Sequence, residues 1–188
     1  DYIRDYIPRN KFIISHLGSI GLTNAIDNLL NCATKMQSYE NIHFLIVGVG
    51  DLLESLREKY SNLHNVTFAP RVEKEMVPSI LERCDLTYFT TVDSKVWRYG
   101  QSLNKIIDYM HNGKPIVAEY SGYPSMINES KCGVFIKNED IDCLEDNFIN
   151  FYNMDRKKLI EIGNKGKDWL IHNRKYNKLA DKYLELIF

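Results

Sequence analysis

Short runs of wholly apolar residues alternate with segments of helical periodicity along most of this chain, and this alternation limits the folds open to it. Residues 44–47 are Phe, Leu, Ile and Val, whereas residues 22–36 place an apolar side chain at every third or fourth position. Strands that are apolar throughout belong to parallel sheets covered by helices on both faces. We therefore expect an α/β fold with a doubly wound, mostly parallel six-stranded sheet of the Rossmann-like type. The strands are expected at residues 12–14, 44–47, 66–68, 86–90, 115–118 and 133–136, and the helices at 22–36, 51–60, 75–84, 103–110 and from 141 onward.

The same pattern predicts where a ligand would bind. In doubly wound sheets, ligands bind at the carboxyl ends of the strands, near the point where the strand order reverses. In the usual strand order, the loops after the first and fourth strands flank that point. Here these loops are residues 18–21, which include two glycines, and residues 91–102.

The composition fits one globular domain. The chain has 188 residues, of which 44% are hydrophobic and 12% aromatic. Its formal net charge of −1 argues against a dedicated binder of duplex nucleic acid. The four cysteines lack CxxC spacing, so we expect neither a disulfide framework nor a zinc site. The lack of a disulfide framework and the apolar runs, which are too short to span a bilayer, favour a cytoplasmic location.

Three regions are expected along the chain. Residues 1–10 are interpreted as a linker or terminal segment, and residues 11–173 as the Rossmann-like domain. Residues 174–188 form an amphipathic helix with an apolar stripe. Because the chain opens on Asp1 rather than on Met, we expect it to be part of a longer protein.

The segment most informative about function is residues 99–118. Ser102 is a candidate N-cap for the helix that follows, whose free backbone N–H groups would face the switch-point crevice and could bind an anion. Lys105 falls in the first turn, where a cation is unfavourable unless an anionic ligand compensates it. Asp108 lies one turn further on the face shared with Asn104, where its carboxylate could accept hydrogen bonds from a ribose. A solvated helix face with an incidental Lys–Asp pair accounts for these residues equally well.

Three other patterns have structural explanations that we favour. Residues 48–50 resemble part of a dinucleotide fingerprint, but Leu53 replaces its third glycine, so a tight turn is expected. Asp140 and Asp142 have the spacing of metal-dependent sugar transferases of another fold, yet they stand at a helix start, where acids are stabilising. His16 is expected to be a strand residue rather than a base.

The segment around Lys105 resembles the donor-site motif of retaining glycosyltransferase family 4, a group 1 glycosyltransferase family with the two-domain GT-B fold. That family has the pattern S-P-N-K-x-x-[D/E]-Y-M-x-x-G-K-P-V. This chain has Ser102-Leu103-Asn104-Lys105, Asp108-Tyr109-Met110 and Gly113-Lys114-Pro115-Ile116. Family-like turns also occur in order at residues 18–22, 47–50, 65–72 and 84–86. The resemblance covers about residues 11–188 and is greatest to members that build capsular polysaccharides and O-antigens.

Two positions depart from the family pattern. Family members commonly carry two glutamates seven residues apart, and these positions hold Gly100 and Asp108 here. The arginine and lysine that often follow the first strand are also missing near residues 19–24. Phosphate binding would then depend more on Asn104, Lys105 and backbone N–H groups.

The resemblance implies the C-terminal, donor-binding domain of a retaining, metal-independent glycosyltransferase that uses a UDP-sugar and no cofactor. The implied donor-site residues are Gly18, Ser19, Gly48, Gly50, Arg71, Val72, Ser102, Asn104, Lys105 and Asp108. Among them, Lys105 is the implied catalytic residue, because its charge would stabilise the departing diphosphate. The saccharide or lipid-linked acceptor would bind a separate N-terminal domain, toward which the final helix would pack, so this chain alone should be inactive. The whole protein could sit at the inner face of the cell membrane.

Three alternatives remain open from the sequence. The chain could be a non-catalytic nucleotide-sugar-binding subunit whose partner supplies the acceptor site. It could belong to a sugar-nucleotide 2-epimerase, which shares the two-domain architecture. It could also be a flavodoxin-like domain for another phosphate ligand.

Overall fold

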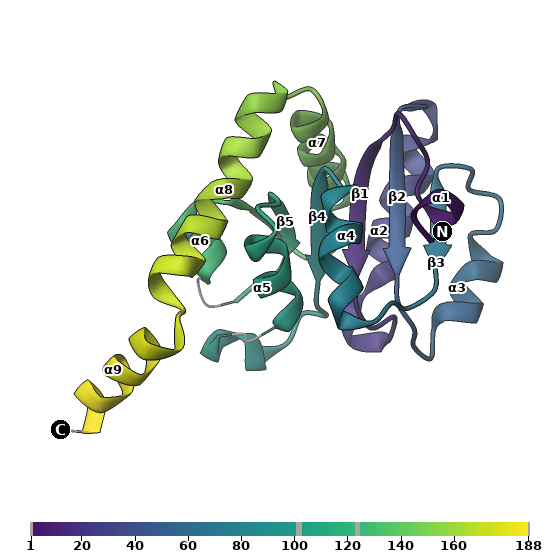
Figure 1. Ribbon diagram of the computed structural model, residues 1–188. Helices are drawn as coiled ribbons and strands as arrows, with labels where there is room; N and C mark the ends of the chain where they lie inside the picture. Colours follow the sequence, from purple (N-terminus) through teal and green to yellow (C-terminus); the bar gives the residue numbers. More distant parts are fainter. Residues whose placement is uncertain (1, 101–102, 123–124, 188) are drawn as a thin grey trace.

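The fold is a parallel six-stranded sheet with helices on both faces (Figure 1). The computed structural model describes residues 2–100, 103–122 and 125–187. The strands are β1 Phe12–Leu17, β2 Ile42–Val47, β3 Val66–Ala69, β4 Leu86–Thr90, β5 Ile116–Glu119 and β6 Gly133–Ile136. Their order is β3-β2-β1-β4-β5-β6 and every neighbouring pair is parallel, which confirms the predicted fold class. The order reverses between β1 and β4.

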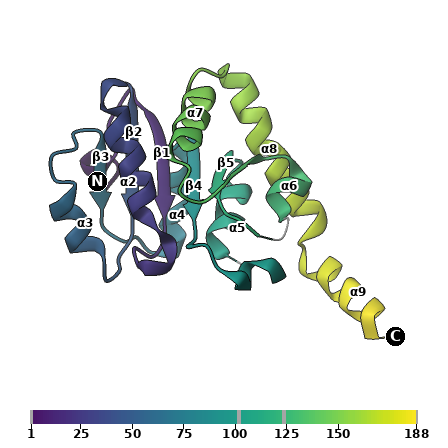
Figure 2. The ribbon, with the colours of Figure 1, turned by 180° about the vertical axis from the view of Figure 1, so that it is seen from behind.

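Nine α-helices and four short 3-10 helices lie in the described residues. The α-helices are α1 Tyr2–Tyr6, α2 Ile26–Lys35, α3 Leu53–Lys59, α4 Val77–Glu82, α5 Asn104–His111, α6 Met126–Ser130, α7 Ile141–Tyr152, α8 Arg156–Asn173 and α9 Tyr176–Ile187. The 3-10 helices are η1 Leu22–Asn24, η2 Met36–Ser38, η3 Lys74–Met76 and η4 Lys95–Tyr99. In Figure 1, α4 and α5 lie in front of the sheet, and Figure 2 shows α2 and α7 on the opposite face.

The core has two layers, one on each side of the sheet. Ile14, Phe44 and Tyr88 pack with residues of α2 and α7. Their chain neighbours point the other way, so that Ile13 and Phe89 pack with residues of α4 and α5. This alternation between two apolar layers is the reason why the strands are apolar at consecutive positions.

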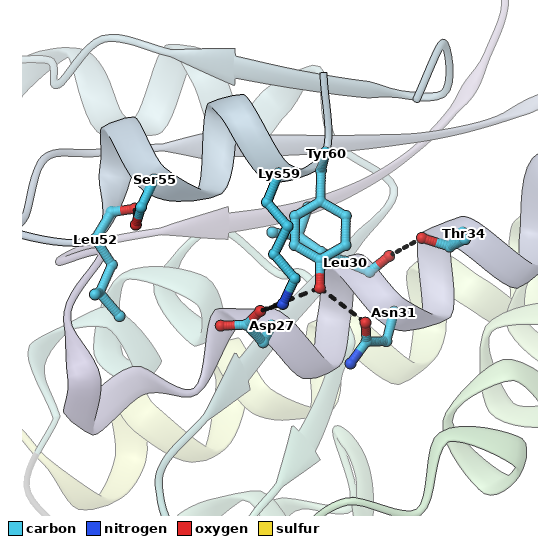
Figure 3. A network of polar contacts seen from close by, with 8 residues as sticks. All are labelled: Asp27, Leu30, Asn31, Thr34, Leu52, Ser55, Lys59 and Tyr60. Carbon is cyan, nitrogen blue, oxygen red and sulfur yellow. Dashed lines mark hydrogen bonds and ion pairs between the residues drawn. The ribbon is translucent and has the colours of Figure 1, made fainter. Parts of the chain in front are cut away.

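Hydrogen bonds and an ion pair connect the end of α3 to α2 (Figure 3). The buried Tyr60 donates its hydroxyl proton to Asn31 over 2.8 Å and lies 3.1 Å from Asp27. Lys59 pairs with the same Asp27 carboxylate and lies over the Tyr60 ring. Asp27, Asn31, Lys59 and Tyr60 are not among the residues that line the pocket described below.

Both chain ends carry helices whose surroundings differ. Residues 1–10 were expected as a linker or terminal segment, and residues 2–6 of it form α1. The next residue, Ile7, is buried, and the Tyr2 hydroxyl donates to the Pro70 carbonyl over 2.6 Å. No residue of α9 is buried, and both views show it extending away from the sheet (Figures 1 and 2).

The helix expected at residues 22–36 is interrupted at its start. Residues 22–24 form η1, Ala25 adopts a left-handed conformation with φ 40° and ψ 43°, and α2 begins only at Ile26. The apolar spacing continues through this break, so periodicity alone could not reveal it. The expected helices at 51–60 and 75–84 are likewise shorter, because each begins with a turn or a 3-10 segment.

Candidate functional site

A pocket of about 450 Å³ opens at the carboxyl ends of β1 and β2, beside the start of α5. Eight of the ten predicted site residues line it: Gly18, Ser19, Gly48, Arg71, Val72, Asn104, Lys105 and Asp108. Gly50 is not among the lining residues, and Ser102 lies outside the described residues. The lining also includes Lys74 and Tyr109, which the sequence analysis did not assign to the site.

Two glycine turns form the floor of the pocket. Gly18 and Gly48 have φ values of +153° and +157°, and a Cβ atom at Gly48 would lie 1.8 Å from the Gly18 carbonyl oxygen. A Cβ at Gly50 would lie 2.2 Å from the carbonyl oxygen of Ile20. The glycines after β2 therefore allow the backbone after β1 to approach closely, which is the structural role of the turn expected at residues 48–50.

Lys105 crosses the pocket from α5 to the turn after β1. Its Nζ atom donates to the side-chain oxygen of Asn24 over 2.9 Å, and a Cβ at Gly18 would lie only 3.0 Å from Nζ. Within the described part of the chain, no carboxylate forms an ion pair with Lys105. Burial lowers the pKa of Lys105 to about 8. The ammonium group is therefore partly desolvated and has no counter-charge from these residues.

Helix α5 points its first turn into the pocket without a side-chain cap. Leu103 is at the N-cap position and makes no side-chain cap hydrogen bond. The cap therefore falls one residue after Ser102, the expected N-cap. The Ile106 backbone N donates to the Leu103 carbonyl over 3.1 Å. The backbone N–H groups of Asn104 and Lys105 have no partner within the helix and are suited to an anion.

Asp108 is held by a lysine from another element. Its carboxylate forms an ion pair with Lys74 of η3 and not with Lys105, so the Lys105–Asp108 pair considered from the sequence is not found among the described residues. Lys74 is far away in sequence, and only the fold brings it to Asp108.

Tyr109 fixes α5 against β1. Its buried hydroxyl lies 2.9 Å from the backbone N of Leu17 and 3.2 Å from the carbonyl oxygen of the same residue. Burial raises the pKa of Tyr109, so the hydroxyl stays neutral. Because Tyr109 and Lys105 both belong to α5, this contact also fixes the position of Lys105 relative to the Gly18 turn.

His16 lies fully buried in β1 next to this turn, as expected for a strand residue. Neither ring nitrogen makes a hydrogen bond of normal geometry to a described residue. Burial and the nearby Lys105 charge lower its pKa well below the usual range, against a weaker opposing effect of the backbone at Ser19 and Tyr88. The ring is therefore neutral and adds no charge beside Lys105.

The acidic pair at residues 140 and 142 has the structural role that we favoured. Asp140 accepts from the backbone N of Cys143 over 3.0 Å and caps α7, and Asp142 pairs with Lys35. Among the described residues, no group of three or more His, Cys, Asp or Glu side chains could hold a metal ion. In the same part of the chain, no helix is long and apolar enough to cross a membrane.

Several solved structures share this fold at low sequence identity. S. aureus TarM superposes with a TM-score of 0.77 at 24% identity, over 95% of this chain and 36% of the TarM chain. Anabaena Alr3699/HepE, solved in complex with UDP, gives a TM-score of 0.74 at 17% identity, over 95% of this chain and 49% of that one. This chain thus spans about a third to a half of these proteins.

A third structure has nearly the same length as this chain. It is the C-terminal domain of the group 1 glycosyl transferase LpcC from Francisella tularensis, with a TM-score of 0.72 at 15% identity, over 93% of this chain and 92% of that one. The fold is therefore that of a GT-B C-terminal domain. None of the curated proteins matches this chain. The family profile described as "Glycosyl transferases group 1" matches residues 11–154, and the chain therefore belongs to the group 1 glycosyl transferases.

Proposed function

We propose that this domain binds the nucleotide-diphosphate-sugar donor of a retaining glycosyltransferase of family 4. The observation that carries the proposal is the Lys105 ammonium group, which is partly buried in the pocket and has no carboxylate partner among the described residues. A partly desolvated cation without a counter-charge is costly, and an anionic ligand in the pocket would offset that cost. The first two backbone N–H groups of α5, those of Asn104 and Lys105, point to the same kind of ligand.

The proposal assigns the donor one orientation in the pocket. The diphosphate lies at the start of α5, near Ser102, Asn104 and Lys105. The ribose lies one turn along the helix at Asp108, and the base lies near Arg71 and Val72 and the turn at residues 48–50. UDP is the favoured nucleotide because the family resemblance implies it, and the Alr3699/HepE neighbour was solved with UDP.

Lys105 is the catalytic residue in this proposal. When the bond between the anomeric carbon and the diphosphate breaks, negative charge develops on the leaving oxygen. An ammonium group already fixed at that place stabilises the charge with little reorganisation, and a helix N-terminus adds to the effect. This chemistry needs no metal ion.

The acceptor belongs to the rest of the protein. We propose that a saccharide or lipid-linked acceptor binds an N-terminal domain, and that the pathway is capsular polysaccharide, O-antigen or similar glycan synthesis. A cytoplasmic location, with the whole protein at the inner face of the membrane, would bring the donor and a lipid-linked acceptor together.

The first test is nucleotide binding by this chain. We expect UDP to bind more tightly than GDP, ADP or CMP, and EDTA to leave the affinity unchanged. Calorimetry with each nucleotide, with and without the chelator, checks both statements. Binding of UDP that is lost on chelation would contradict the metal-independent phosphate site, and absence of binding to all four nucleotides would overturn the proposed function.

A further inference from the structure

Asn24 is the residue that holds the Lys105 side chain in the pocket. Its side-chain oxygen accepts a hydrogen bond of 2.9 Å from Nζ across 81 residues of sequence. Asn24 ends η1, the short helix between β1 and α2, and it does not belong to the motif that surrounds Lys105. The two residues meet only because the loops after β1 and β4 flank the same point of the sheet.

The segment that carries Asn24 is fixed on both sides. The Asn24 backbone N donates to the Gly21 carbonyl over 3.0 Å, and the Thr23 carbonyl accepts from the backbone N of Val92 over 3.1 Å. Ala25, directly after it, takes the left-handed conformation that turns the chain into α2. The Asn24 side chain therefore starts from a defined backbone position rather than from a loose loop.

The groups around Lys105 leave its charge uncancelled. His16 in β1 is neutral, the Tyr109 hydroxyl is neutral and bound to the Leu17 backbone, and the Asp108 carboxylate is paired with Lys74 of η3. Asn24 supplies a neutral oxygen. A neutral acceptor orients an ammonium group, whereas a carboxylate at the same place would also neutralise it and repel a phosphate.

We propose that Asn24 is a positioning residue, which holds the Lys105 ammonium group over the Gly18 turn so that its full charge is available to the donor diphosphate. This inference rests on the proposed function for its ligand, but the contact itself exists without the ligand. Asn24 acts through Lys105 and need not touch the donor.

Two variants separate positioning from charge. Asn24→Ala removes the acceptor, and we expect UDP to bind about 2- to 10-fold more weakly, the equivalent of one hydrogen bond. Asn24→Asp keeps an acceptor but adds a competing negative charge, and we expect a larger loss. Uridine, which lacks the diphosphate, should bind both variants as it binds the wild type. Asn62→Ala, at an exposed asparagine after α3, is the matched control and should change neither affinity.

A second readout needs no nucleotide. NMR of the Lys105 side chain should give a titration midpoint near pH 8 in the wild type. The midpoint should fall in Asn24→Ala, which loses a hydrogen bond to the charged form, and rise in Asn24→Asp. If Asn24 only supported the backbone, its two substitutions would not move the Lys105 midpoint in opposite directions.

The outcomes distinguish the two proposals. If UDP binds and Lys105→Ala weakens it, but both Asn24 variants keep wild-type affinity and midpoint, the positioning role is overturned and the proposed function stands. If the midpoints move as expected but no nucleotide binds the wild type, the donor site is overturned while the Asn24 contact is supported. Shifts in both affinity and midpoint support both proposals.

Discussion

At the scale of single residues, the position of Lys105 is unfavourable for the fold in two ways. A cation in the first turn of a helix opposes the helix dipole, and burial adds a further cost. Removing it should therefore weaken ligand binding without weakening the fold. This combination is characteristic of a residue that serves a ligand rather than packing.

Lys105→Ala should weaken UDP binding by about 1.5–3 kcal/mol, the range for hydrogen bonds to charged groups, and should hardly affect uridine. Without ligand, the variant should melt no lower than the wild type. Calorimetry and thermal melting measure the two effects. A variant that melts lower and keeps full UDP affinity would show that Lys105 is a structural residue.

Asp108 should behave differently, because a ribose is common to UDP and uridine. We expect Asp108→Asn to weaken both ligands by similar factors in calorimetry. Lys74→Met is the matched control, since it breaks the same ion pair but keeps the carboxylate. That surface pair contributes about 0–1 kcal/mol to stability, so both variants should stay folded. Equal loss of uridine affinity in both variants would assign the effect to the ion pair instead.

The sequence could predict the residues of one motif but not their partners. Asn104, Lys105 and Asp108 share a helix, so their spacing placed them in the site. Asn24, Lys74 and Tyr109 act through contacts that span from 34 to 92 residues of sequence. No local pattern marks such contacts, because they depend on which strands become neighbours.

At the scale of elements, the pair β2 and β3 carries a buried histidine. His43 of β2 lies 2.8 Å from the hydroxyl of Thr67 in β3, and burial, with smaller effects of Lys11 and His64, lowers its pKa to about 4. An unfolded histidine titrates near pH 6.5. The folded state therefore binds fewer protons than the unfolded state between these two values.

Stability should consequently be highest above pH 6.5 and fall as the pH is lowered toward 4. His43 should account for about 2 kcal/mol of the loss between pH 7.5 and pH 5. Denaturant unfolding of the wild type and of His43→Gln at both values measures this contribution. An equally steep loss in the variant would assign the pH dependence to other groups.

Helices and strands were predicted well where the backbone follows the hydrophobic period, and poorly where the backbone conformation breaks while that period continues. All six strands lie within a few residues of their expected places. Strands β1, β2, β4 and β5 are buried on both faces, and the edge strands β3 and β6 are partly buried against the two layers, so all six have runs of apolar residues. The break at Ala25 and the short helix η4 escaped prediction. Both depend on contacts outside their own segment, such as the hydrogen bond from Val92 to Thr23.

At the scale of the whole molecule, the domain holds two complete apolar layers of its own. We therefore expect the isolated chain to unfold cooperatively in denaturant but to transfer no sugar, because the acceptor site is proposed to lie on a separate N-terminal domain. Assays with saccharide and lipid-linked acceptors and a UDP-sugar check the second statement. Measurable turnover would show that the acceptor site is contained in this chain.

The interlocked glycine turns also limit how such a sequence can diverge. A side chain at Gly48 or Gly50 would displace the backbone of the segment that leads from β1 to Asn24, so one substitution there would disturb both turns. Ser19, Val49 and Arg71 border the same pocket, and their side chains are exposed. In a lineage that acquires a different donor, we expect replacements to accumulate at these three positions while the glycines are inherited unchanged.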